Sequence, residues 1–421
     1  MIQELYKHYI KNPIICTDTR KIEQGCIFFA LKGEKFNGNE FAKQAIIEGA
    51  SLVVIDEKEF KTSDKCLLVE NVLETLQELA NYHRKQLDIP FIGITGTNGK
   101  TTTKELINAV LSSKYKTSAT AGNFNNHIGV PLTILSIPQN CDIAIIEMGA
   151  NHMKEIDFLC NIAEPNFGLI TNIGTAHIEG FGSKENIIKT KNELYQFIHK
   201  NKGELFVNAN DKLLINLSER IKKTTYGKEN AVCEAQLISS TPFVKLKWKN
   251  NIIDSQLYGT YNFDNILAAI CVGEYFEVYD QNIIAAIENY TSSNNRSEIK
   301  VIDSNTYYLD AYNANPSSMN IAIDTFVENT STNKIMVLGD MLELGDISKD
   351  EHQKIVTKAN DLKLNSIFVG NEFARISNKY GFNFVKDNNE AKQLLNDKNL
   401  SDYHILIKGS RGIQLEKIVK S

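Results

Sequence analysis

The chain has 421 residues, of which 42% are hydrophobic and 23% are charged, with a formal net charge of −5. This composition is typical of soluble globular proteins, the length predicts two to four domains, and the charge argues against binding nucleic acid through bulk electrostatics. No apolar stretch approaches the roughly 20 residues that cross a membrane, and the first residues lack the apolar core of a signal peptide. The seven cysteines are scattered without a C-x-x-C pair, which favours reduced thiols in a cytoplasmic protein.

The first segment, residues 1–88, is predicted to mix short strands and helices. Apolar runs predict strands at 26–31, 52–55 and 66–69, and helices are expected over 39–48 and 73–85. We therefore expect a small α/β domain before Pro90, where the next strand begins.

A glycine-rich loop opens the second segment. The run Gly96-Thr97-Asn98-Gly99-Lys100-Thr101-Thr102 lies between an apolar strand at 91–95 and an amphipathic helix. Backbone N–H groups and the helix dipole favour a phosphate in such a turn, Lys100 can add charge, and the Thr101 hydroxyl can reach Mg²⁺. The strict P-loop pattern fails because Ile94 stands where it requires glycine. ATP or GTP binding is the base hypothesis, and a glycine-rich turn with an exposed lysine is the alternative.

The remainder of the second segment, 89–295, alternates strands with helices. Strands are expected at 91–95, 143–148, 168–173 and 205–208, with a helix over 184–199. This alternation predicts a parallel sheet with right-handed crossovers. Between 231 and 258, Val244, Leu246 and Trp248 alternate with lysines, which predicts an antiparallel hairpin at the domain edge, turning at Asn250-Asn251.

The third segment, 296–421, repeats the α/β pattern. Strands are predicted at 334–338, 366–370 and 404–408, and the absence of G-x-G-x-x-G gives no support for a dinucleotide site. Two polar loops, 310–316 and 408–412, follow strands. Such loops are common binding sites, although turns and helix caps are the default interpretation.

Two further side chains lie near the expected ends of parallel strands, and a third lies on the helix that follows. Glu147 ends an apolar strand beside the phosphate loop, where a Mg²⁺ ligand is wanted, and a solvated strand end is the alternative. His177 follows the next strand and can reach the same crevice, but a lone histidine is more often a packing or surface residue. Lys191, on the helix after it, is by itself one of several exposed lysines.

Together these pieces resemble the ATP-dependent Mur ligases over almost the whole chain. The resemblance is carried by the loop at 96–102, Glu147-Met148-Gly149, Thr171-Asn172-Ile173-Gly174-x-Ala-His177 and Gly259-x-x-Asn262-x-x-Asn265. The run Tyr312-Asn313-Ala314-Asn315-Pro316 is similar to the branch that adds D-alanyl-D-alanine, and motifs at 17–20, 28–33, 122–131, 339–345 and 408–411 agree. The chain departs from the family at Tyr261, where histidine is common, and at Cys26 and Asn39.

The resemblance implies a three-domain α/β fold. A small α/β N-terminal domain (1–88) is expected to bind the UDP-sugar peptide, followed by a central P-loop parallel-sheet ATPase domain (89–295) and a Rossmann-like C-terminal ligase domain (296–421). The implied substrates are ATP, UDP-N-acetylmuramoyl-tripeptide and D-alanyl-D-alanine. The implied metal is Mg²⁺, with two ions, and the implied assembly is a monomer without nucleic-acid or membrane partners.

The resemblance also assigns roles residue by residue. The catalytic residues are expected to be Lys100, His177, Lys191 and Arg296. ATP is expected to be bound by Gly96, Thr97, Asn98, Gly99, Lys100, Thr101, Thr102, Asn265, Arg296 and Asp310. The substrates are expected to be bound by Thr19, Arg20, Asn126, Tyr312, Asn313 and Asn315. The metal ligands are expected to be Thr101, Glu147, His177 and Lys191, the last as a carbamate.

The implied reaction is formation of an amide through an acyl phosphate, which supplies the UDP-sugar pentapeptide for peptidoglycan synthesis. Another Mur-type ligase, a folylpolyglutamate-type ligase and a non-catalytic nucleotide-binding protein are the alternatives. The run at 312–316 argues against the other ligases, and the complete set of expected catalytic residues argues against a decayed site. Because three domains hold the substrates, we expect domain closure to assemble the site.

Overall fold

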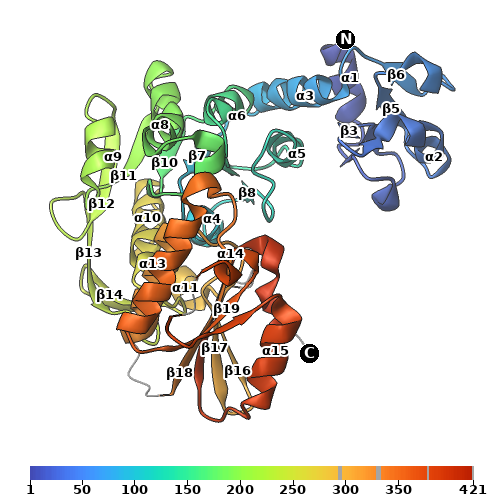
Figure 1. The fold of residues 1–421 in the computed structure, drawn as a ribbon. Helices are drawn as coiled ribbons and strands as arrows, with labels where there is room; N and C mark the ends of the chain where they lie inside the picture. Colours follow the sequence, from blue (N-terminus) through green and yellow to red (C-terminus); the bar gives the residue numbers. More distant parts are fainter. Residues whose placement is uncertain (293–295, 329–332, 377–378, 420–421) are drawn as a thin grey trace.

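The computed structural model describes residues 1–292, 296–328, 333–376 and 379–419. Its described residues form three successive α/β regions, built on sheets of four, nine and six strands (Figure 1). The first region lies to one side and is joined to the second by helix α3, and the third packs against the second. The predicted boundary at 295 falls on residues 293–295, outside the described residues. None of the helices in the described ranges has the length and apolar character needed to cross a membrane.

The first region is built on a parallel sheet in the order β1-β2-β5-β6. The predicted strands and helices are present, and the N-terminal helix α1, the strand β1 and the short pair β3-β4 were not predicted. The elements are α1 (Ile2–Tyr9), β1 (Ile15–Cys16), β2 (Ile27–Phe29), β3 (Lys32–Gly33), β4 (Phe36–Asn37), α2 (Ala42–Ile47), β5 (Leu52–Ile55), β6 (Cys66–Leu68) and α3 (Val72–Gln86).

Helix α3 belongs structurally to both of the regions that it joins. Asn71 caps it, because the Asn71 Oδ1 accepts from the backbone N–H groups of Leu73 and Glu74 at 2.9 and 3.1 Å. Its buried stripe, with Leu76 and Leu79, packs on α1 and on two helices of the second region, α5 (Gly129–Leu135) and α6 (Glu155–Ala163). One apolar core therefore continues from the first region into the second.

The second region is a sheet in the order β15-β14-β13-β12-β11-β10-β7-β9-β8. Neighbouring strands from β12 to β8 are parallel, and β14 pairs antiparallel with β13 and β15. The strands are β7 (Phe91–Thr95), β8 (Thr117–Ala119), β9 (Ile143–Glu147), β10 (Phe167–Ile170), β11 (Glu204–Asn208), β12 (Lys223–Gly227), β13 (Cys233–Ser239), β14 (Lys245–Trp248) and β15 (Asn251–Asp254). The remaining helices are α4 (Lys100–Ser112), α7 (Ile178–Phe181), α8 (Lys184–Lys200), α9 (Lys212–Leu217), α10 (Tyr261–Tyr275) and α11 (Asp280–Asn289).

Both faces of this central sheet are covered by helices. Phe91 of β7 joins the core shared with α5, α6 and α8, whereas Ile92 and Ile94 join the core shared with α4 and α10. Burial on both faces explains the continuous apolar runs of the parallel strands. The predicted edge hairpin is confirmed, but its turn lies at Lys249 and Asn250, because Asn251 already pairs with Trp248.

The third region is a sheet in the order β16-β17-β21-β18-β19-β20, parallel except for the unpredicted antiparallel hairpin β16-β17. Adjacent β17 and β21 end side by side, so that Asp310 pairs in register with Lys408. The elements are β16 (Glu298–Ile302), β17 (Asn305–Asp310), α12 (Pro316–Glu328), β18 (Lys334–Gly339), α13 (Ser348–Asp361), β19 (Asn365–Val369), α14 (Asn371–Ala374), β20 (Asn383–Val385), α15 (Asn388–Asp397) and β21 (His404–Lys408).

Candidate active site

A pocket of about 940 Å³ lies where the carboxyl ends of the central strands face the third region. The described residues that line it come from the second and third regions and none from residues 1–88. Among the predicted site residues, the lining includes Thr97, Asn98, Gly99, Lys100, Thr102, Asn126, Glu147, His177, Asn265, Arg296, Asp310, Tyr312, Asn313 and Asn315. Crevices at the carboxyl ends of parallel strands are the usual ligand sites of α/β folds.

The phosphate loop requires its two glycines for steric reasons. Gly96 and Gly99 have φ angles of 147° and 78°, a region that side chains disfavour. A Cβ at Gly96 would collide with the Thr171 hydroxyl, and one at Gly99 would lie 2.6 Å from the Asn265 Oδ1. The loop is therefore packed between the end of β10 and helix α10.

The segment after β10 fixes the backbone of the loop. The Asn172 Oδ1 accepts from the Asn98 N–H at 3.0 Å, and the Asn172 Nδ2 donates to the Asn98 carbonyl at the same distance. The Thr97 hydroxyl donates to the Gly174 carbonyl at 3.2 Å and accepts from the Gly174 N–H at 2.9 Å. These bonds fix the loop at the amino end of α4, where the helix dipole favours an anion.

Lys100 is folded back over the loop. Its Nζ donates to the carbonyls of Gly96 at 2.8 Å and Thr97 at 3.1 Å. Burial lowers the pKa of Lys100, the nearby Arg296 lowers it further, and Glu147 opposes both effects. Two cations thus face one space, which favours an anion between them.

Two oxygens beside Lys100 have the properties of an incomplete metal site. The Thr101 hydroxyl and the Glu147 Oε2 are buried and have no hydrogen-bond partner among the described residues. The other carboxylate oxygen, Oε1, accepts from the Asn125 Nδ2 at 2.8 Å. One hydroxyl and one carboxylate fit Mg²⁺, which takes its remaining ligands from water and substrate phosphates. The described residues contain no group of three or more His, Cys, Asp or Glu side chains placed to hold a metal ion.

His177 and Lys191 lie at different depths. His177 lines the pocket, and its Nδ1 contacts the Glu343 carboxylate of the third region. Burial lowers the pKa of His177, which Glu343 partly offsets. Lys191 is 3% exposed and does not line the pocket. Burial, and then the charge of Lys100, lower the pKa of Lys191 to about 7.

On the α10 side, Asn265 is held by two hydrogen bonds. It accepts from the Thr103 hydroxyl at 3.0 Å and donates to the Asn262 Oδ1 at 2.8 Å. The Tyr261 hydroxyl lies 2.6 Å from the Ser297 hydroxyl, across the junction with the third region. Tyr261, where the chain departs from the family, therefore links two regions through its hydroxyl.

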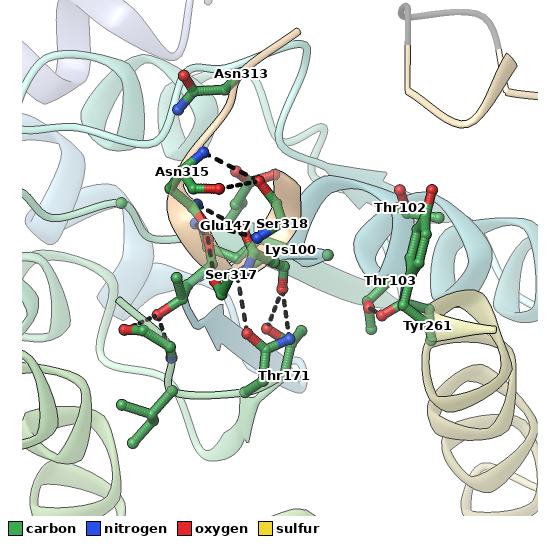
Figure 2. Close-up of a pocket in the computed structure, with 18 of the residues that line it drawn as sticks. Lys100, Thr102, Thr103, Glu147, Thr171, Tyr261, Asn313, Asn315, Ser317 and Ser318 are labelled. Carbon is green, nitrogen blue, oxygen red and sulfur yellow. Dashed lines mark hydrogen bonds between the residues drawn. The ribbon is translucent and has the colours of Figure 1, made fainter. Parts of the chain in front are cut away.

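The loop 310–316 meets the phosphate loop directly. The Asn315 Nδ2 donates to the Asn98 Oδ1 at 2.9 Å, and the Asn98 Nδ2 donates to the Ser317 hydroxyl at 3.0 Å. The Asn315 Oδ1 also accepts from the Ser318 N–H at 2.9 Å, which caps α12. Figure 2 shows Asn315, Ser317 and Ser318 gathered near Lys100, while Tyr261 lies apart with Thr102 and Thr103.

Several predicted site residues bond to neighbouring protein groups, whether or not they line the pocket. Thr19 and Arg20 lie in the first region, where Arg20 pairs with Asp18 at 2.7 Å. The Asn126 Oδ1 accepts from the N–H of Gly129, the first residue of α5, at 2.9 Å. Asp310 pairs with the buried Lys408 at 2.5 Å.

Asn125, Ser317 and Glu343 were not predicted as site residues. Asn125 and Glu343 lie within the quoted motifs, and Ser317 follows one directly, but what each contacts depends on how distant segments meet.

Comparison with known families identifies the class of protein. Residues 13–89 match the model "Mur ligase family, catalytic domain", residues 94–273 match "Mur ligase middle domain", and residues 295–411 match "Mur ligase, glutamate ligase domain". The chain belongs to the Mur ligase family.

Individual relatives narrow this class. The UDP-N-acetylmuramoyl-tripeptide–D-alanyl-D-alanine ligase of Bacillus subtilis is 37% identical over 100% of this chain and 96% of its own length. The crystal structure of MurF from Acinetobacter baumannii has a TM-score of 0.85 at 28% identity, covering 96% of this chain and 92% of that one. MurF ligase from Thermotoga maritima in complex with ADP also has a TM-score of 0.85, at 26% identity, covering 97% and 96% of the two chains.

Proposed function

We propose that this chain is an ATP-dependent amide ligase that joins D-alanyl-D-alanine to the carboxylate of UDP-N-acetylmuramoyl-tripeptide. The product is the UDP-sugar pentapeptide of peptidoglycan synthesis. The full-length similarity to a ligase of that name supports the substrates. The observation that carries the proposal is the contact of Asn98 with Asn315 and Ser317, which brings the loop typical of the D-alanyl-D-alanine branch onto the phosphate loop.

The chemistry follows from this arrangement. A peptide carboxylate is a poor acyl donor, so its oxygen first attacks the γ-phosphorus of ATP and releases ADP. Lys100 and Arg296 neutralise charge on the transferring phosphoryl group. The neutral amine of the dipeptide then attacks the acyl carbon of the acyl phosphate, and the tetrahedral intermediate loses phosphate and the proton of the attacking nitrogen to leave an amide. The protein contributes position, charge and exclusion of water, and no protein nucleophile is needed.

Thr101 and Glu147 are the residues that we propose to hold Mg²⁺. The ion would supply positive charge at the β- and γ-phosphate oxygens. A second ion would be held by His177 and a carbamate on Lys191. The supporting observation is the pKa of about 7 at Lys191, because only the neutral amine attacks carbon dioxide. The nitrogen of the neutral amine bonds to the carbon and loses one proton to solvent, which turns the neutral side chain into an anion.

The reaction is tested by measuring phosphate release with both substrates present. We expect release only when UDP-N-acetylmuramoyl-tripeptide and D-alanyl-D-alanine are supplied together, with L-alanyl-L-alanine, D-alanine and L-lysine as controls. Turnover with another amine, and none with D-alanyl-D-alanine, contradicts the substrate assignment. Exchange of ¹⁸O between the bridging and non-bridging β,γ positions of ATP, with the tripeptide alone, tests for the acyl phosphate.

The carbamate has its own test. We expect ¹³C-labelled carbon dioxide to give a carbamate signal in the wild type that is missing in Lys191→Ala, and short carboxylates to restore part of the activity of that variant. Full activity of Lys191→Ala refutes the role.

We also propose that the enzyme is a cytoplasmic monomer with domain boundaries at 88/89 and 295/296. The UDP group would be bound around Thr19 and Arg20. Light scattering of the purified protein tests the monomer, and limited proteolysis tests the boundaries.

A further inference from the structure

The ring of Tyr312 lies against the guanidinium group of Arg296. The Arg296 Cζ is 3.5 Å from the ring centre, and the Arg411 Cζ is 5.7 Å from it. Tyr312 and Arg296 both line the pocket, although Arg296 precedes the hairpin β16-β17 and Tyr312 follows it. The hairpin thus brings an arginine and an aromatic ring face to face at the site.

Among the described residues, few polar groups contact the guanidinium of Arg296. Its Nε is buried and lacks a hydrogen-bond partner among the described residues, and no ion pair between described residues includes Arg296. The guanidinium also lies close enough to Lys100 to depress the pKa of that lysine. Arg296 is thus held near a second cation, with its guanidinium lying over the Tyr312 ring.

We propose that Tyr312 is a positioning residue, which stacks on Arg296 and aims its guanidinium at the phosphate groups bound beside Lys100. The proposal rests on the proposed function, because it requires a nucleotide in this pocket. It assigns to the first residue of the Tyr-Asn-Ala-Asn-Pro loop a role toward ATP, in place of direct contact with the acceptor substrate.

Stacking suits this task better than an ion pair does. The N–H groups of a guanidinium lie in its plane, whereas the ring contacts its face. A carboxylate partner would occupy the donors that phosphate oxygens need. An aromatic partner instead restricts the side chain and leaves every donor available.

The loop that carries Tyr312 is itself held in place. The Lys408 Nζ donates to the Asn313 carbonyl at 3.3 Å, and the Ser410 hydroxyl donates to the Ala314 carbonyl at 3.3 Å. Asn315 then anchors the loop to Asn98 of the phosphate loop. The ring therefore presents Arg296 from a frame that is already fixed relative to the phosphate site.

A double-mutant cycle on the full-length enzyme tests the proposal. We expect Tyr312→Leu to lower kcat about tenfold, the scale of one partly buried cation–π contact, without raising KM for D-alanyl-D-alanine. Tyr312→Phe keeps the ring and should recover most of that loss. In an Arg296→Ala background, Tyr312→Leu should have no further effect. Tyr279→Leu, at a side chain 77% exposed and outside the pocket lining, controls for loss of a tyrosine.

Two outcomes overturn the proposal. If Tyr312→Phe is as damaging as Tyr312→Leu, the hydroxyl acts on a substrate. If Tyr312→Leu costs as much in the Arg296→Ala background as in the wild type, the ring acts independently of the arginine. Tyr312→Met replaces the leucine variant if thermal unfolding shows that the latter is misfolded.

Binding of Mg-ADP gives a second readout that needs no turnover. It is measured by calorimetry in the wild type, Tyr312→Leu, Arg296→Ala and the double variant. Tyr312→Leu should weaken binding in the wild type and leave it unchanged in the Arg296→Ala background. Lack of ligase turnover in the wild type would instead contradict the proposed function. The Mg-ADP binding measurements would still test the contact between Tyr312 and Arg296.

Discussion

The central region meets its two neighbours through contacts of opposite character. Toward the first region the contact is mainly apolar and closely packed, with a few buried hydrogen bonds. Leu5 and Tyr9 of α1 share one buried core with Ile134 and Leu135 of α5, and the Tyr9 hydroxyl donates to the Leu135 carbonyl at 2.6 Å. A core of this kind cannot exchange its contacts for water without a large loss of burial.

Toward the third region the contact is mainly polar. It includes the hydrogen bonds of Asn98 to Asn315 and of Tyr261 to Ser297, and one aromatic pair, Tyr258 and Tyr308, with ring centres 4.6 Å apart. Such bonds can be exchanged for bonds to water or ligand at little cost, and the pocket lies here. We therefore expect substitutions on the polar side to change activity and substitutions on the apolar side to change stability.

The largest effect is expected at the polar side, from Lys100→Met. Loss of the charge on the transferring phosphoryl group should lower kcat about 10³-fold, while the urea midpoint stays near that of the wild type. Lys114→Met, at a surface lysine on the same region, is the control. A large loss of stability in Lys100→Met, or a loss of activity below tenfold, would contradict the expectation that substitutions on the polar side change activity and not stability.

The apolar side is tested next by Arg84→Met. The Arg84 guanidinium is buried, lies 3.8 Å from the Phe91 ring centre, and donates to the carbonyls of Ala163 and Glu164 at 2.9 and 2.8 Å. Leaving these carbonyls unpaired should lower the free energy of unfolding by about 3 kcal/mol, with kcat of the folded enzyme unchanged. The neighbouring Lys85→Met removes an exposed ion pair and should cost below about 1 kcal/mol. Similar losses in the two variants would show that the joint does not depend on this arginine.

A smaller effect is expected from Asn98→Ala, which removes the bonds between the phosphate loop and α12. We expect kcat to fall about tenfold, because the phosphate loop and the segment that begins α12 lose the contact that positions them for the transition state. The free energy of unfolding should change little. Ser240→Ala is the matched control, since its hydroxyl bonds Glu328 at 3.1 Å across the same two regions but away from the pocket. Equal effects of the two variants would mean that any contact between the second and third regions supports activity to the same extent.

Many of the core strands were predictable from sequence, because strands buried on both faces form local apolar runs. Short strands such as β1, β8, β12 and β20 were not predicted. The phosphate loop was also predictable, because the local backbone conformation requires Gly96 and Gly99. The hairpin β16-β17 was missed because Val301 and Ile302 are exposed on a strand at the sheet edge, so no buried run marks it. The turn after β14 was displaced by one residue because register, rather than turn propensity, decides it.

The site was less predictable than the fold. The motifs identify Glu147 and Arg296, but they do not reveal that Asn125 holds one carboxylate oxygen or that Tyr312 holds the guanidinium. Those contacts join segments that are distant in sequence, and they depend on where the third region docks. Lys191 is the sharpest case, because in sequence it resembles any exposed lysine, whereas the structure buries it.

Lys191 also yields a final prediction, a dependence of stability on pH in buffers free of carbon dioxide. Its pKa is about 7 in the folded chain and near 10.5 when exposed. Between these values the unfolded chain binds more protons, so the free energy of unfolding should rise with pH, by at most about 1.4 kcal/mol per pH unit. Lys191→Met should therefore be more stable than the wild type at pH 7, and this advantage should shrink toward pH 10. Bicarbonate should stabilise only the wild type, because carbamate formation consumes the neutral amine. A stability difference that is the same at every pH would show that Lys191 stays protonated, and would contradict its proposed role as a carbamate.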